Sequence, residues 1–240
     1  FIHGGRWSMG ERTDYAFIGA KMAELGYITV IPSYRLYPDV KWPVMMEDIA
    51  LAAKWVDQNI GTYGAQGDDI FLMGHSSGAH MAAMLIADDT HLKQYGMYPS
   101  FFKGFAGLAG PYHFTPVEPD LVDLFGGGNY ERMQVTHYID GGEPPMLLLH
   151  GLRDELVLIG SQERLAARIR AQGAAVETRR YRDMNHEDML KAFTFAGRDE
   201  RNIIREIDAF FRGLMGHADI LVRPGVAPWR SYGGVSGRGD

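Results

Sequence analysis

Cysteine is absent from the 240 residues, which excludes disulfide frameworks, thiolate metal sites and a cysteine nucleophile. An excess of basic residues is absent too: 24 Lys and Arg stand against 30 Asp and Glu, giving a formal net charge of −6. Nucleic-acid binding needs a basic face, so no nucleic-acid partner is expected. No apolar run reaches the ~18 residues of a membrane-spanning helix, so no membrane span is expected.

Glycine, in contrast, is abundant. The chain has 30 glycines, well above the usual share of about 7%. They follow no fixed period, so they predict turns and places where two backbones pass closely. The length and the 46% hydrophobic content suit one large globular domain.

Strand-like and helix-like segments alternate along the chain. Helices are expected at 14–25, 43–60, 77–87, 159–171 and 202–214. Strands are expected at 1–2, 27–31, 69–73, 104–108, 146–149 and 176–181, with an irregular stretch at 111–145. This alternation predicts an α/β fold with a mostly parallel central sheet and helices on both faces.

The two ends of the chain differ from its middle. Residues 217–240 are rich in Gly, Pro and Ser, and we interpret them as a C-terminal tail after a single domain over residues 1–216. The first residues already belong to a motif and include no Met. We therefore expect a chain that is truncated at its N-terminus, and the compartment stays open.

The strongest chemical signal is the pentapeptide Gly74-His75-Ser76-Ser77-Gly78, between an expected strand and an expected helix. A sharp strand-to-helix turn of this kind exposes its central serine as a nucleophile. Small residues are needed two positions before and after that serine, because neighbouring backbone passes close. Glycine occupies both positions, so Ser76 is the candidate nucleophile.

A serine hydroxyl needs a base to take its proton. In hydrolases of this topology the chain order is Ser, then Asp or Glu, then His. Asp154 follows the penultimate expected strand and His186 follows the last one, so they fit the acid and the base. His150 is a second candidate base, and three neighbours of His186 are alternative acids. These are Asp183, Glu187 and Asp188.

A second glycine motif, His3-Gly4-Gly5-Arg6-Trp7, follows the strand-like start of the chain. Acyl transfer needs main-chain N–H groups aimed at the developing oxyanion, and a glycine-rich turn can present them. The residue after the nucleophile, Ser77, would supply a further donor.

Together these motifs carry a family resemblance. The segments FIHGGRW, SYRLYPDVKWP, GHSSGAH, HGLRDELV and MNHEDM resemble the α/β-hydrolase superfamily. Within it they resemble the carboxylesterase and lipase branch with a His-Gly-Gly oxyanion turn, which includes hormone-sensitive-lipase-like esterases and kynurenine formamidases. The family has about two strands before that turn, which agrees with the expected truncation.

The resemblance implies a site and its chemistry. It implies a Ser76–Asp154–His186 triad, with no metal and no organic cofactor. The oxyanion donors would be the N–H groups of Gly5, Arg6 and Ser77, and Gly4 would shape the turn. The family segment Asp-Tyr-Arg-Leu-Ala-Pro is matched here from Ser33 to Pro38, with Ser33 and Tyr37 as departures, and would support the oxyanion loop.

We therefore expect a serine hydrolase that cleaves carboxylic esters, short-chain or aryl, through an acyl-serine intermediate. An arylformamidase acting on N-formylkynurenine is the alternative, because Arg6 replaces the third glycine of the lipase turn and Trp7 follows it. A non-catalytic, hydrolase-like binding protein is a second alternative. The expected partner is a small-molecule ester or amide, bound against Trp7, Tyr112 and Phe114, and homo-oligomerisation stays open.

Overall fold

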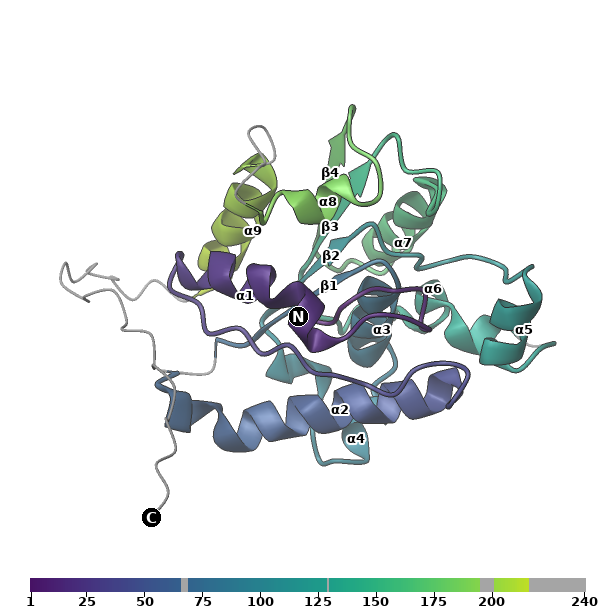
Figure 1. Cartoon of the computed structure of the whole chain (residues 1–240), viewed down its shortest axis with the longest axis horizontal. Helices are drawn as coiled ribbons and strands as arrows, with labels where there is room; N and C mark the ends of the chain where they lie inside the picture. The colour runs from purple at the N-terminus through teal and green to yellow at the C-terminus, as the bar shows by residue number, and fades with distance from the viewer. Residues whose placement is uncertain (66–68, 129, 195–200, 216–240) are drawn as a thin grey trace, which may run out of the picture.

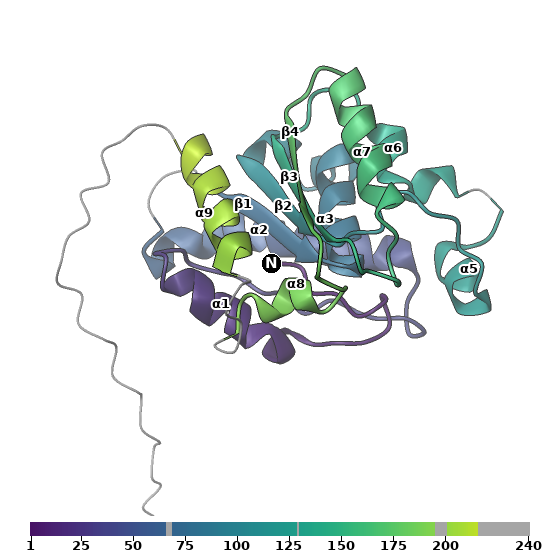
Figure 2. The same ribbon diagram turned by 90° about the horizontal axis from the view of Figure 1, so that it is seen from above.

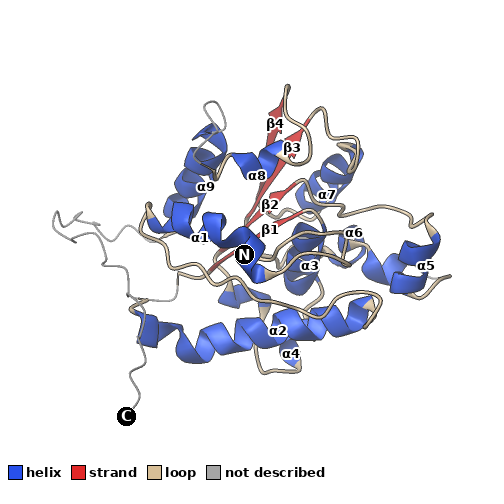
Figure 3. Cartoon of the chain, in the orientation of Figure 1, coloured by secondary structure: helices blue, strands red, loops and turns tan. Residues whose placement is uncertain are grey.

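The computed structural model describes residues 1–65, 69–128, 130–194 and 201–215. Its centre is a parallel sheet in which the four strands lie in their chain order. The strands are β1 (Phe71–His75), β2 (Gly104–Leu108), β3 (Met146–Gly151) and β4 (Val176–Tyr181). Figure 3 shows these strands side by side at the centre of the molecule, with helices around them.

Helices alternate with the strands and follow them (Figure 1). The α-helices are α1 (Ala16–Ala23), α2 (Trp42–Asn59), α3 (Ser77–Ala87), α4 (Thr90–Lys93), α5 (Pro119–Phe125), α6 (Val135–Tyr138), α7 (Gly160–Ala171), α8 (Asp188–Lys191) and α9 (Arg201–Leu214). The short 3-10 helices are η1 (Arg12–Tyr15), η2 (Ile60–Tyr63), η3 (Pro99–Phe101) and η4 (Glu131–Met133).

Two apolar cores cover the two faces of the sheet. Successive strand residues point to opposite faces, so Leu72 and Leu148 pack in one core while Met73 and Leu149 pack in the other. The first core also contains buried residues of α2, α3 and α7, and the second contains those of α1, α8 and α9. Figure 2 shows these helices on either side of the sheet, so the predicted α/β class is confirmed.

Most predicted elements are present with small shifts of their ends, but the stretch 111–145 is not wholly irregular. It contains α5, η4 and α6. α5 has Pro119 at its first position and ends at Gly126, whose φ of +83° is a conformation that favours glycine. Its buried Leu121, Leu124 and Phe125 attach it to the core. An element of seven residues is too short to show a helical period.

The predicted strand at 27–31 is also wrong. The residues do form a β-branched, apolar segment, yet the structure assigns them no regular element. A strand needs a row of hydrogen bonds to a neighbouring strand. Residues 27–31 have a hydrogen bond from the Phe1 amino group to Val30 O, which is not such a row. Next to it, Ile2 makes only an isolated bridge to Gly74 of β1. No ladder of hydrogen bonds therefore connects 27–31 to the sheet within the described residues.

Two further expectations concern the chain as a whole. The predicted tail at 217–240 lies outside the described residues, so it stays a prediction. Among the helices that are described, none combines the length and the apolar character that crossing a bilayer requires.

Candidate active site

Ser76 lies in the sharp turn between β1 and α3. Its backbone has φ +54° and ψ −127°, a strained conformation for a residue with a side chain. A Cβ atom added to Gly78 would lie 2.2 Å from Ile2 O, and one added to Gly74 would lie 2.6 Å from Gly78 O. Both glycines are therefore required by close backbone, as the motif predicts. The turn leaves Ser76 only partly buried at the carboxyl end of β1.

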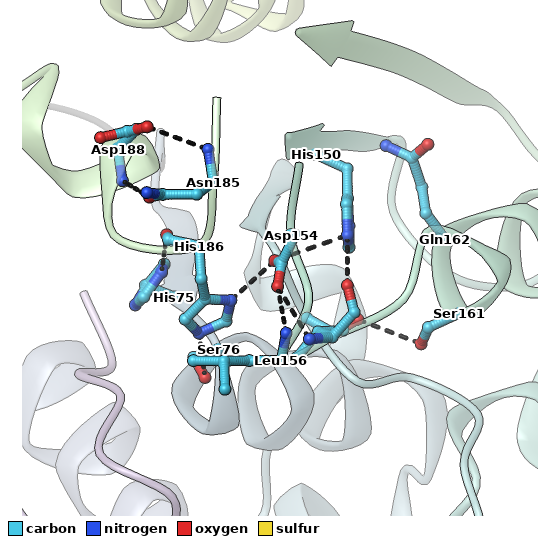
Figure 4. A network of polar contacts seen from close by, with 12 residues as sticks. His75, Ser76, His150, Asp154, Leu156, Ser161, Gln162, Asn185, His186 and Asp188 are labelled. Carbon is cyan, nitrogen blue, oxygen red and sulfur yellow. Dashed lines mark hydrogen bonds and ion pairs between the residues drawn. The ribbon is translucent and has the colours of Figure 1, made fainter. Parts of the chain in front are cut away.

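The loops that follow β3 and β4 bring Asp154 and His186 to this serine (Figure 4). His186 Nε2 lies 2.8 Å from Ser76 Oγ, and His186 Nδ1 lies 2.7 Å from Asp154 Oδ2. An ionised carboxylate can only accept hydrogen bonds, so His186 donates its Nδ1 proton to Asp154. Its Nε2 lone pair then faces the hydroxyl of Ser76.

Asp154 is buried and held by its own loop. Its Oδ1 accepts hydrogen bonds from the main-chain N–H groups of Leu156 (3.0 Å) and Val157 (2.8 Å). Burial by itself raises the pKa of this carboxyl, but the hydrogen bonds from His186 and Val157 outweigh that and keep its pKa below the ordinary value. The acid therefore stays ionised and oriented towards His186.

Two further histidines lie beside this arrangement. His75 donates a hydrogen bond from Nε2 to His186 O (3.1 Å), and burial lowers the pKa of its ring to about 3, so the ring is neutral. His150 lies with Nε2 2.7 Å from Val157 O, so it supports the Asp154 loop and is not next to Ser76. The contact of His75 with the loop of His186 has no signal in the sequence.

Among the hydrogen bonds and ion pairs of the described residues, none joins the His186 ring to the carboxylate of Asp183, Glu187 or Asp188. Asp183 pairs with Arg153 on the surface. Asp188 binds the N–H of Asn185 and the ammonium of Lys191. Asp183 therefore makes a surface ion pair, and Asp188 stabilises the loop that carries His186. In the described part of the chain, no group of three or more His, Asp or Glu side chains could hold a metal ion.

The glycine turn at 3–7 packs against Ser76. A Cβ atom on Gly4 would lie 3.1 Å from Ser76 Cβ, and one on Gly5, where φ is +120°, would lie 2.0 Å from Met9 O. Among the hydrogen bonds of the described residues, none is donated by the main-chain N–H of Gly5, Arg6 or Ser77. Two N–H groups of the turn and the N–H that directly follows Ser76 thus make no hydrogen bond among the described residues.

The 33–38 segment supports this turn through two hydrogen bonds. Tyr34 donates its hydroxyl proton to His3 O (2.8 Å), and Tyr37 N donates to Trp7 O (2.9 Å). Both contacts fix main-chain groups of the turn and leave the N–H groups of Gly5 and Arg6 unused. The segment therefore has the supporting position that the resemblance implies.

The three predicted substrate contacts lie in different surroundings. Trp7 is only 4% exposed and stacks on Phe114, with ring centroids 5.7 Å apart. Phe114 is partly buried. Tyr112 is 1% exposed and packs edge-on against Phe105. Their contact with a substrate stays a prediction, and Phe114 is the most accessible of the three.

A sharp turn that carries a serine at the end of a parallel strand, with a carboxylate and a histidine on later loops, is the arrangement found in the α/β-hydrolase class of fold. The comparisons agree with this. The BD-FAE family model matches residues 1–106. The structure of a thermophilic esterase, Est2 of Thermogutta terrifontis, superimposes with a TM-score of 0.75 at 19% identity, over 92% of this chain and 82% of that one. The predicted fold is therefore confirmed.

Relatives at the sequence level are also esterases by name. Esterase LipQ of Mycobacterium tuberculosis is 29% identical over 192 residues, covering 72% of this chain and 46% of that protein. A probable isoprenylcysteine alpha-carbonyl methylesterase of Oryza sativa subsp. japonica is 26% identical over 216 residues, covering 79% of this chain and 51% of that protein. The chain thus spans about half the length of these relatives.

Proposed function

We propose that this protein is a serine hydrolase that cleaves carboxylic esters through an acyl-serine intermediate. The observation that carries the proposal is the pair of hydrogen bonds that links Ser76 Oγ through His186 to Asp154, at 2.8 and 2.7 Å. The names of the relatives support it, since LipQ is called an esterase and Est2 is a solved esterase structure.

In the acylation step, Ser76 Oγ attacks the ester carbonyl carbon while His186 Nε2 takes the hydroxyl proton. The C–O bond to the alcohol then breaks, and His186 returns the proton to the leaving oxygen. Asp154 keeps the imidazole in the required tautomer and stabilises its cationic form. The lowered pKa of Asp154 suits this role, because the carboxylate remains charged throughout.

Negative charge on the carbonyl oxygen would be stabilised by the free N–H groups of Gly5, Arg6 and Ser77. Removing one such donor typically costs about 3 kcal/mol of transition-state stabilisation. In the second half of the cycle a water molecule, deprotonated by His186, attacks the acyl-Ser76 carbonyl and releases the acid. Ser76 recovers its proton from His186.

Hydrolysis of p-nitrophenyl acetate by the Ser76→Ala variant tests this proposal. We expect its kcat to fall by about 10⁶-fold, because the acyl-Ser76 intermediate can no longer form. Ser100→Ala is the matched control, since Ser100 is exposed on η3, and it should keep wild-type activity. A Ser76→Ala protein that hydrolyses the ester at the wild-type rate contradicts the proposal.

An arylformamidase would use the same three residues on a formamide bond. The feature that favours it is the turn His3-Gly4-Gly5-Arg6-Trp7, in which Arg6 and Trp7 replace a third glycine and its neighbour. Turnover of N-formylkynurenine and of short p-nitrophenyl esters, compared at equal enzyme concentration, separates the two substrates. We expect the esters to give the higher kcat/KM.

A further inference from the structure

Three leucines in the loop after β3 have large exposed side chains. Leu152 is 49% exposed, Leu156 72% and Leu158 70%. A single exposed leucine is ordinary on a protein surface, but three within seven residues give one loop an unusual amount of exposed apolar surface, and such surface marks binding sites. We call these three side chains the leucine wall.

The loop that carries the leucine wall is firmly fixed. Leu152 N donates to Tyr181 O (2.8 Å), so the start of the loop is tied to β4. The N–H groups of Leu156 and Val157 bind Asp154 Oδ1, and Val157 O contacts His150 Nε2 at 2.7 Å. The backbone therefore has little freedom to turn the leucines inwards. Their exposure is a property of the fold.

The loop that carries the leucine wall also holds a group of the site. The main-chain N–H of Leu156 binds one oxygen of Asp154 while His186 binds the other, so this loop lies close to the base. In the view of Figure 4 the Leu156 side chain extends from its loop towards the side where Ser76 and His186 lie. An ester held at Ser76 would have its substituents near this loop.

We propose that the leucine wall binds the hydrocarbon group of the ester, so that the substrates are esters with an aliphatic chain of several carbons. This inference rests on the proposed function and adds its substrate class. The aliphatic chain of the ester would lie on the leucine wall, so that leucine and methylene surface is removed from water. Complete burial of one methylene changes an equilibrium about 4-fold, so contact on one side should give about 2-fold.

Two series of esters test the proposal, at concentrations below those at which the esters form micelles. In one series the acyl chain lengthens from acetate to octanoate with p-nitrophenol as the leaving group. In the other the alcohol lengthens from ethyl to octyl with a fixed acetyl group. The wild-type kcat/KM should rise about 1.5- to 2-fold per methylene in at least one series, and the series that rises identifies the half of the ester that is bound.

The variants Leu156→Gln and Leu158→Gln, singly and together, remove the apolar surface and keep the size of the side chain. The double variant should flatten the chain-length dependence, and Leu158→Gln, which does not alter the residue that binds Asp154, should keep hydrolysis of the acetate within about 2-fold of wild type. Leu51→Gln is the matched control, because Leu51 is 48% exposed on α2, away from the Asp154 loop. It should keep the wild-type slope.

Several outcomes would overturn the leucine wall as a substrate site. Two flat series in the wild type, or a full slope in the double variant, would do so. A wild-type dimer that light scattering shows to become a monomer in the double variant would make the wall an interface between copies. In each case labelling of Ser76 by a fluorophosphonate leaves the proposed function intact. A wild-type chain that takes no label and cleaves no ester contradicts both.

Discussion

The guanidinium of Arg6 binds the carboxylate of Asp120, with Nη2 3.0 Å from both carboxylate oxygens. Arg6 belongs to the glycine turn beside Ser76 and has a left-handed backbone with φ +54°. Asp120 belongs to α5, which lies 114 residues further along the chain. Helix α5 is thereby tied to a residue whose main-chain N–H is a proposed oxyanion donor.

Removing the charge of Asp120 should therefore lower kcat and leave KM nearly unchanged. Because the oxyanion forms only in the transition state, a loosened Arg6 N–H affects catalysis more than substrate binding. We expect Asp120→Asn to reduce kcat by no more than about 5-fold, since the pair is exposed and screened. Added salt should lower wild-type kcat towards the variant's value.

The neighbouring Asp123 provides the matched control for this measurement. Asp123 accepts a hydrogen bond from the Tyr37 hydroxyl and pairs with the Lys41 ammonium, and neither of these groups belongs to the glycine turn. Asp123→Asn also removes contacts of α5, but it keeps the ion pair between Arg6 and Asp120, so its kcat should match that of wild type. Equal losses of kcat in the two variants would show that α5 acts only through general stability.

The parts of the site that could be predicted from the sequence are those that local motifs define. The turn around Ser76 needs glycine at 74 and 78 for steric reasons, and those residues are visible in the sequence. Asp154 and His186 could be predicted because each follows a strand in a fixed order. The tie between Arg6 and Asp120 could not, because two distant surface charges carry no local pattern.

The errors in the predicted fold have similar causes. Residues 27–31 have strand composition, but composition does not supply the neighbouring strand that a ladder needs. Helices α5 and α6 could not be predicted, because elements of seven and four residues are too short to show a helical period. His75 illustrates the same limit within the site, since its hydrogen bond to His186 O joins residues 111 positions apart.

The orientation of His186 by Asp154 gives a second prediction. Asp154→Asn should lower kcat by about 10⁴-fold, because an amide does not hold the imidazole in the tautomer that accepts the serine proton. Asp183→Asn serves as control, since Asp183 is exposed and pairs with Arg153, and it should stay within about 2-fold of wild type. Steady-state hydrolysis of p-nitrophenyl acetate measures both. A small loss in Asp154→Asn would contradict the assigned acid.

The shape of the oxyanion turn can be tested at Gly5. A methyl group there would lie 2.0 Å from Met9 O, at a φ of +120° that side chains avoid. Gly5→Ala should shift the turn, lower kcat by at least about 100-fold and reduce the free energy of unfolding by about 1–3 kcal/mol.

Gly61→Ala, where a methyl group meets no atom within 4 Å, should change neither quantity by much. Denaturant unfolding and steady-state kinetics measure the two effects. A Gly5→Ala protein with normal kcat would place the oxyanion donors elsewhere.

Acid stability should depend on His80, which is buried with Nε2 2.7 Å from Met133 O. Burial lowers the pKa of its ring from 6.5 to about 4, against the smaller effect of the Met133 hydrogen bond. The unfolded chain then binds the extra proton below pH 6.5, so the stabilisation is present above that pH and is lost as pH falls towards 4. Between pH 7 and pH 5 this residue should cost about 2 kcal/mol.

The variant His80→Gln keeps a hydrogen-bond donor and does not titrate. Its free energy of unfolding, measured by denaturant at pH 7 and pH 5, should therefore fall by about 2 kcal/mol less than that of wild type over this interval. An identical fall in both proteins would mean that the folded protein binds a proton at His80 as readily as the unfolded chain does.

The identity of the nucleophile is tested most directly by labelling with a fluorophosphonate and locating the adduct by mass spectrometry. The account predicts one adduct on the peptide that contains Ser76, formed slowly in His186→Gln and not at all in Ser76→Ala. An unlabelled wild-type protein, or an adduct on another serine that persists in Ser76→Ala, would contradict it.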